Sequence, residues 1–270
     1  MTEYLIDRLC DMGMTVNIDN SNNLYGQFGE ADSYPCIVAH TDEVHKSKPE
    51  DFEVLQHKGT LFGFSNSEKC LVGIGADDKN GIWIALKAAE SLIKAKKPVK
   101  VAFFPGEEVG CIGSGDAEMD FFKDCRFVLQ CDRKGGSDFI TKISGVELCS
   151  SQFKKDIAPL LKKHGYSETT GLTTDVYELK CRKLGVSVAN MSCGYYNPHT
   201  DSEMTSIKEL KNALSLAKSI MKLKDVYEHT ATITRTYFGG YNYNYPYRYN
   251  DDWRLDLEEN AENKRGLIYW

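Results

Sequence analysis

Five short stretches of the sequence contain aspartate or glutamate, and two of them also contain histidine, the side chains that often bind divalent metal ions in enzymes. They contain seven candidate residues: His40 and Asp42 in VAHTDEV, Asp77 in GIGADDKNG, Glu107 and Glu108 in FFPGEEVG, Asp132 in VLQCDRKG, and His199 in YYNPHTDSE. Each stretch follows or adjoins an apolar run that predicts a β-strand. Two imidazoles and several carboxylates at strand ends suit a site for two divalent metal ions.

A hydrolytic site with two metal ions needs neutral imidazoles, carboxylates, one group that bridges both ions, and a water molecule between them. The candidate residues can be divided accordingly. His40 and Asp132 could hold one ion, and Glu108 and His199 could hold the other. Asp77 could bridge the two ions.

Such a site also needs a general base that is not itself a ligand. Glu107 adjoins Glu108 in the chain, but neighbouring side chains point in different directions, so Glu107 is the predicted base. Asp42 stands two residues after His40 and would lie on the same face of a continuing strand. There it could accept a hydrogen bond from the second ring nitrogen of His40 and orient the ring.

The pattern of apolar residues predicts the elements that position these side chains. Near-continuous apolar runs typical of buried strands lie at 35–39, 99–104, 127–129 and 186–189. Helical spacing of apolar residues predicts helices at 2–12, 80–95, 153–163 and 206–224. Alternation of strands and helices predicts an α/β fold, a three-layer α/β/α sandwich with a mostly parallel central sheet.

Ligands of such sheets bind beyond the carboxyl ends of the strands. His40, Glu107 and Asp132 each lie a few positions after a predicted strand, so one edge of the sheet should collect them. Thr174 and Asp175 are predicted only to cap a helix.

Composition limits the other classes of function. The chain has 270 residues, of which 41% are hydrophobic, and a net charge of −6 that disfavours a nucleic-acid partner. No apolar run approaches the roughly 18 residues of a membrane span, and the first residues show no targeting pattern. Nine cysteines, an odd number, favour reduced thiols and a cytoplasmic location.

Two parts are expected: a catalytic domain at 1–227 and a tail at 228–270 that is rich in tyrosine and asparagine. The tail is predicted to be poorly ordered or to pack on the domain, where it would dock a partner or line a substrate groove.

Taken together, HTDEV, GADDKNG, PGEEVGCIGS, the CD before RKGG, and NPHTDSE resemble the motifs of the dizinc exopeptidases, which include peptidase T, carboxypeptidase G and aminoacylases. The resemblance covers residues 36 to about 222, and the five pieces occur in the family's order. It implies a zinc-exopeptidase-like fold, with Asp77 as the bridging ligand, Glu107 as the base and Glu108 as a ligand. It also implies a cis peptide bond between Asp77 and Asp78.

One segment departs from the family pattern. In peptidase T and carboxypeptidase G, an inserted α/β domain used for dimerisation and for closing over the substrate lies between the residues that match Asp132 and His199. Here that segment is too short for an insert, so the catalytic domain alone is expected. The groups that the insert supplies to bind a substrate carboxylate or an oxyanion are then absent. Any oxyanion stabiliser beyond the metal ions must come from this domain or the tail, with Tyr195, Tyr196 and the tyrosines of 241–249 as candidates.

The predicted function is that of a metal-dependent hydrolase, a dizinc metallopeptidase that cleaves small peptides as an aminopeptidase or another exopeptidase. The ions are expected to be Zn²⁺, with Co²⁺ or Mn²⁺ as alternatives. An amidase or deacylase of N-acyl amino acids remains open, because the same site cleaves any amide. A catalytically inactive binding module with a partner-docking tail is the alternative of another class. The sequence leaves the side-chain preference and the oligomeric state open.

Overall fold

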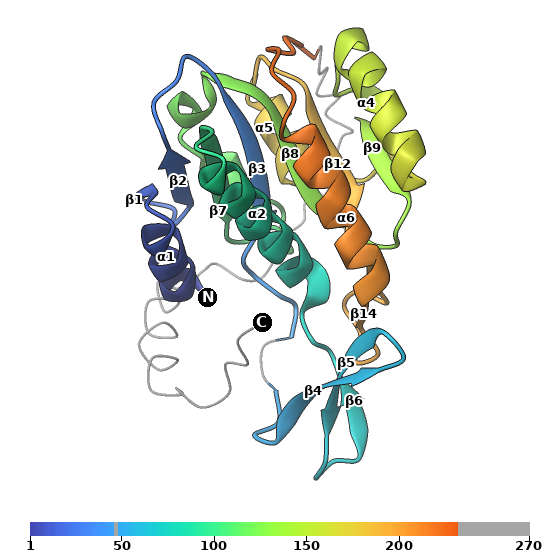
Figure 1. Ribbon diagram of the computed structural model, residues 1–270. Helices are drawn as coiled ribbons and strands as arrows, with labels where there is room; N and C mark the ends of the chain where they lie inside the picture. The colour runs from blue at the N-terminus through green and yellow to red at the C-terminus, as the bar shows by residue number, and fades with distance from the viewer. Residues whose placement is uncertain (46–47, 232–270) are drawn as a thin grey trace, which may run out of the picture. The chain divides into compact units, whose positions relative to one another are not determined.

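The computed structural model describes residues 1–45 and 48–231. Within these residues, nine strands form one mixed sheet (Figure 1). Eight of them follow one another in the order β1 (Thr15–Ile18), β2 (Leu24–Phe28), β7 (Val99–Phe104), β3 (Tyr34–His40), β8 (Cys125–Arg133), β12 (Val188–Ser192), β9 (Asp138–Ile143) and β10 (Val146–Glu147), and β11 (Ser167–Gly171) pairs with β9.

The centre of this sheet is parallel and its edges are partly antiparallel. β3 pairs in parallel with β7 and β8, and β12 pairs in parallel with β8. Every residue of β3 and β7 is buried, because helices cover both faces, as the continuous apolar runs predicted. The last predicted strand lies slightly later than expected, since Val186 forms only an isolated bridge with Glu228.

Helices form the outer two layers. α2 (Ala76–Lys94) packs on β3, β7 and β8, and it contacts α6 (Ile207–Ile220), which in turn contacts α4 (Ser151–His164). On the opposite face, α5 (Asp175–Cys181) contacts β3, β8 and β12, and α3 (Ile112–Asp116) packs on α5. α1 (Thr2–Asp11) packs beside β1 and β2, and the 3₁₀ helix η1 spans Met119–Phe122. The predicted α/β fold with three layers is confirmed.

A second sheet carries the loop that contains His199. It has five strands among the described residues: β13 (Tyr195–Tyr196), β14 (Met204–Ser206), β5 (Thr60–Ser65), β4 (Phe52–His57) and β6 (Cys70–Val72). β13 and β14 pair antiparallel on either side of His199, and β14 continues the pairing to β5. The sequence shows weak strand signals at 52–55 and 61–64, within β4 and β5, but it did not predict the sheet. The strands β6, β13 and β14 have only two or three residues, and β14 pairs with a distant segment.

The segment between Asp132 and His199 contains no separate domain. Its strands β9 to β12 belong to the main sheet. Its helix α5 packs on β8 and β12, and α4 contacts β8 through the rings of Phe153 and Phe127. The expected absence of an insert is therefore confirmed. Most of the predicted tail, 232–270, lies outside the described residues, and none of the described helices is long and apolar enough to cross a membrane.

Candidate metal centre

Parallel strands bring the candidate ligands to one edge of the main sheet. His40 is the last residue of β3, Asp132 is the penultimate residue of β8, and Glu107 and Glu108 follow β7. Because these three strands are neighbours and parallel, their carboxyl ends meet. Asp77 reaches the same place from the first turn of α2, where the predicted cis peptide bond between Asp77 and Asp78 is present.

The two carboxylate oxygens of Asp77 face two different histidines. Asp77 Oδ1 lies 3.0 Å from His40 Nε2, which is also 3.7 Å from Asp132 Oδ1. Asp77 Oδ2 lies 3.4 Å from His199 Nε2, which is also 2.9 Å from Glu108 Oε1. Asp77 therefore stands between a His40–Asp132 pair and a His199–Glu108 pair, the position that a bridging carboxylate requires.

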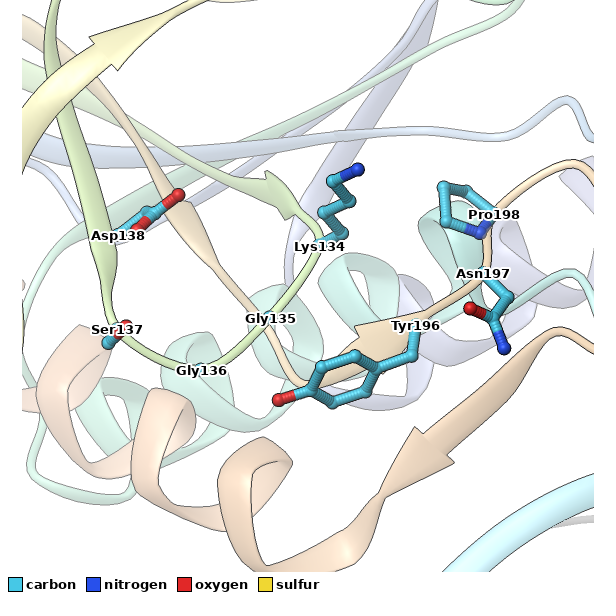
Figure 2. A pocket seen from close by; sticks show the side chains of 8 residues that line it. All are labelled: Lys134, Gly135, Gly136, Ser137, Asp138, Tyr196, Asn197 and Pro198. Carbon is cyan, nitrogen blue, oxygen red and sulfur yellow. The ribbon is translucent and has the colours of Figure 1, made fainter.

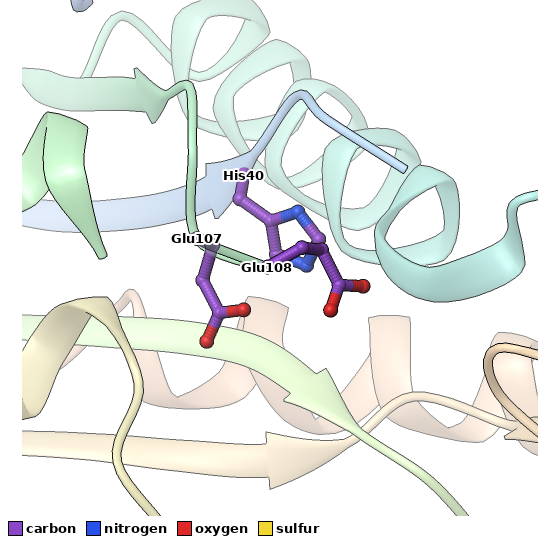
Figure 3. A group of neighbouring side chains, drawn as sticks. All are labelled: His40, Glu107 and Glu108. Atoms are coloured by element: carbon purple, nitrogen blue, oxygen red, sulfur yellow. The ribbon is translucent and has the colours of Figure 1, made fainter. Parts of the chain in front are cut away.

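Three overlapping groups of these residues are close enough to hold an ion. In each group the possible ligand atoms lie within 4.8 Å of one another. The groups are Asp77 with Glu108 and His199, His40 with Asp78 and Asp132, and His40 with Glu107 and Glu108. In the last group, Figure 3 shows the two glutamate carboxylates pointing to different sides of the His40 ring.

The charges of the centre fit divalent cations. Among the described residues, no lysine or arginine forms an ion pair with its carboxylates, whose only ionic partners are His40 and His199. Glu108 Oε1 is buried and has no hydrogen-bond partner, although His199 Nε2 lies near it. Several buried acids without basic partners are costly unless metal ions neutralise them.

The pKa values of the centre reflect this concentration of negative charge. Burial and the charge of Asp132 raise the pKa of Glu107 to about 9. Burial and the charge of Asp77 raise the pKa of Glu108 to about 7 and that of Asp132 to about 6. Burial disfavours a charged His40, but hydrogen bonds to Asp132, Asp42 and Asp77 outweigh it and raise the pKa of His40 well above its usual range.

Asp42 supports both the histidine and the glutamate pair. Its two carboxylate oxygens accept the backbone N–H groups of Glu107 and Glu108, each at 3.1 Å. Nδ1 of His40 lies 3.1 Å from the backbone carbonyl of Asp42 and 3.4 Å from its carboxylate. The predicted contact with His40 is thus present, with the carbonyl as the nearer acceptor, while the carboxylate mainly fixes the loop after β7.

Further polar residues surround Asp132. The sequence analysis named Tyr195 only as a candidate for oxyanion binding, and it did not link Gln130 or Thr174 to the site. The hydroxyl of Tyr195 donates to Asp132 Oδ1 at 3.1 Å. The hydroxyl of Thr174 and the amide of Gln130 each lie 3.1 Å from Asp132 Oδ2. Thr174 is the N-cap residue of α5, as predicted, but its side chain accepts no helix N–H and instead contacts Gln130 and Asp132. The buried carboxylate of Asp175 accepts hydrogen bonds from Gln130 and Ser114.

Glu203 holds the backbone beneath Asp77. This carboxylate is buried and accepts the N–H groups of Gly75 and Asp77, at the N-terminus of α2. The free N–H groups of a helix N-terminus favour a negative charge there. The motif NPHTDSE contains Glu203, and this is the signal that could have linked the His199 loop to Asp77.

The fold and the acidic centre place the chain among the metal-dependent peptidases of exopeptidase type. Residues 36–265 match the model of "Peptidase family M20/M25/M40", and the chain belongs to this family. The resemblance stated from the motifs is therefore confirmed. No curated protein matches the sequence.

Several solved structures share the fold. Aminopeptidase PepT from Bacillus cereus has a TM-score of 0.66 at 12% identity, covering 81% of this chain and 91% of that chain. A tripeptidase from Staphylococcus aureus has a TM-score of 0.65 at 13% identity, covering 82% and 91%. An aminopeptidase from the archaeon Desulfurococcus kamchatkensis has a TM-score of 0.61 at 16% identity, covering 83% and 89%. At these identities the likeness concerns the fold.

Asp42→Asn tests the support of the glutamate loop. An amide can accept only one of the two N–H groups that Asp42 now accepts, so we expect the loop to shift and peptidase activity to fall about 10- to 100-fold. Bound metal, measured by elemental analysis, should be largely retained. Asp120→Asn, at an exposed position, is the matched control, and unchanged activity in Asp42→Asn would contradict the assigned role.

The raised pKa values predict how the stability of the metal-free protein depends on pH. Glu107, Glu108 and Asp132 hold protons in the folded state at pH values where the unfolded chain, with carboxyl pKa values of about 4, has released them. Folding then binds protons, so stability should fall as pH rises from about 4 to about 9. For a protein of this size, a change of 1 kcal/mol in the free energy of unfolding shifts Tm by about 2–4 °C. We therefore expect Tm to fall by several degrees.

The measurement is a thermal melt at pH 5, 7 and 8.5, in a chelator and in Zn²⁺. The chelated protein should lose Tm as pH rises, and Zn²⁺ should oppose the loss by replacing the protons. Glu107→Gln should raise the Tm of the chelated protein at pH 8.5. A chelated Tm that is constant or rises with pH would contradict the charge assignment.

Proposed function

We propose that the chain is an aminopeptidase that removes N-terminal residues from small peptides, with two divalent metal ions and Glu107 as the general base. The observation that carries the proposal is the position of Asp77, whose two oxygens face His40 on one side and His199 on the other. Membership of the peptidase family supports it, as do the aminopeptidases among the structures that share the fold.

In this proposal, His40 and Asp132 hold one ion, Glu108 and His199 hold the other, and Asp77 binds both. Imidazole and carboxylate ligands suit Zn²⁺, with Co²⁺ or Mn²⁺ as alternatives. When bound, the ions supply polarisation of the scissile carbonyl and a lowered pKa for a water molecule.

Glu107 is the residue we propose to move the proton. Its side chain is largely shielded from solvent, and no lysine or arginine of the described residues pairs with it. Nearby cations lower the pKa of a carboxylic acid. Bound metal ions should therefore lower the raised pKa of Glu107, so that its carboxylate form is available near neutral pH. A carboxylate oxygen of Glu107 can then accept a proton from the attacking water and deliver it to the leaving nitrogen.

Two other functions remain as alternatives. Hydrolysis of N-acyl amino acids would use the same residues, because the bond is also an amide. An inactive binding module would rest on the tail at 228–270, most of which lies outside the described residues. We also propose a cytoplasmic location, which the odd number of cysteines, nine, supports.

Glu107→Gln tests the base. The substitution keeps the shape of the side chain and removes its ability to accept a proton, so kcat should fall about 10²- to 10⁴-fold. Two bound metal ions per chain should remain, because Glu107 is not a proposed ligand. Glu3→Gln, on the exposed side of α1, is the matched control. Full activity in Glu107→Gln would exclude the proposed role.

A substrate comparison tests the function itself. Protein loaded with Zn²⁺ should hydrolyse alanyl and leucyl anilides and unblocked dipeptides, and it should lose this activity in a chelator and regain it with Zn²⁺. Faster hydrolysis of N-acetyl amino acids would favour the deacylase. Bound metal without hydrolysis of either class would favour the binding module.

Asp77→Asn tests the proposed bridging role of Asp77. It should lose metal and activity together, because one oxygen of the proposed bridge is replaced by an amide. Retention of both ions with full activity would contradict the bridging role.

A further inference from the structure

A cavity of about 360 Å³ adjoins the candidate metal centre. It lies between the turn that follows β8 and the segment that precedes His199, as Figure 2 shows. Residues 134–138 form one wall of the cavity, and residues 196–198 form the other. The volume falls at the small end of the range of roughly 300–1,000 Å³ for ligand pockets.

Both walls of the cavity continue directly from proposed metal ligands. Lys134 stands two residues after Asp132, immediately after the last residue of β8. Pro198 adjoins His199 in the chain. A substrate with its scissile bond at the metal centre therefore has this cavity as a neighbour.

One positive charge at the cavity has no protein partner. Arg133 forms an ion pair with Asp138 at 3.3 Å, which neutralises the acid of the lining. Lys134 is exposed, and its ammonium group forms neither an ion pair nor a hydrogen bond with any residue that the structure describes. The cavity thus offers an unpaired cation beside a centre that is otherwise acidic.

The glycine turn adds backbone donors next to this charge. In residues 1–45 and 48–231, the N–H of Gly135 bonds the carbonyl of Tyr195, whereas the N–H groups of Gly136 and Ser137 have no acceptor. A side chain at Gly136 would collide with Glu209, which Tyr196 holds by a hydrogen bond of 2.6 Å. The turn therefore packs closely against the side chain of Glu209. Successive free N–H groups of such a turn can bind an anion.

We propose that Lys134 and the turn at Gly136 and Ser137 bind a carboxylate on the leaving-group side of the scissile amide. The ligand class is a short peptide whose free C-terminal carboxylate falls within reach of the metal centre, because an ammonium group and backbone N–H groups together match a carboxylate. The proposal rests on the proposed peptidase function. It makes Lys134 a residue that determines substrate length and the state of the C-terminus.

The test compares Ala-Ala, Ala-Ala amide and Ala-Glu amide as substrates of wild type, Lys134→Met and Lys134→Arg. Lys134→Met should lower kcat/KM for Ala-Ala about 10- to 100-fold, in line with loss of a charged hydrogen bond. The kcat/KM of this variant for Ala-Ala amide should stay within about twofold of the wild-type value. Lys134→Arg should keep much of the preference for Ala-Ala over Ala-Ala amide. Lys222→Met, at another exposed lysine, should leave kcat/KM for all three substrates unchanged.

Each other outcome overturns a defined part of the proposal. Equal hydrolysis of Ala-Ala and its amide by wild type, unchanged in Lys134→Met, would exclude the carboxylate site and leave the peptidase function intact. A loss in Lys134→Met confined to Ala-Glu amide would assign the site to an acidic side chain instead of the C-terminus. Wild type that hydrolyses none of the three would overturn the peptidase function itself.

Discussion

The position of the Asp77 carboxylate is the constraint on which the rest of the site depends. Its oxygens must face His40 and His199 at once, although these histidines come from different sheets. Glu203 makes this possible, because it accepts the N–H of Asp77 from the same loop that carries His199. The second sheet holds that loop through β14 and β5. The start of α2 and the His199 loop are thus fixed to each other, and a change in either would separate the two halves of the centre.

The protein neutralises buried charge elsewhere but leaves it unpaired here. The buried ammonium of Lys100 contacts the carboxylate of Asp124 and the ring of Tyr34. The buried ammonium of Lys180 donates to three backbone carbonyls. The acids at the carboxyl edge of β3, β7 and β8 receive no such partner among the described residues. Since an unpaired buried charge destabilises a fold, its persistence at one edge indicates that a cation or a proton completes the site.

The sequence predicted what depends on local pattern and missed what depends on distant pairing. The runs of β3 and β7 were recognised because strands buried on both faces are apolar throughout, and the parallel sheet then brought His40 and Glu107 together. The second sheet was missed because β13 and β14 are too short to show a period. Thr174 was interpreted as a helix cap, the common local role of threonine. Its bond to Asp132 depends on how α5 docks against β8, which no local pattern reveals.

Because no inserted domain lies between Asp132 and His199, the proposed function would place substrate recognition on the loops that carry the proposed metal ligands. The side chain of His199 is half exposed, whereas His40 is almost fully buried, so the centre opens to solvent on the His199 side. The cavity beside it is built from residues that directly follow Asp132 and directly precede His199. A movement of either ligand would therefore also move a wall of this cavity. In the proposed function, metal binding and substrate binding would therefore be coupled through a few peptide units, without a second domain to transmit the coupling.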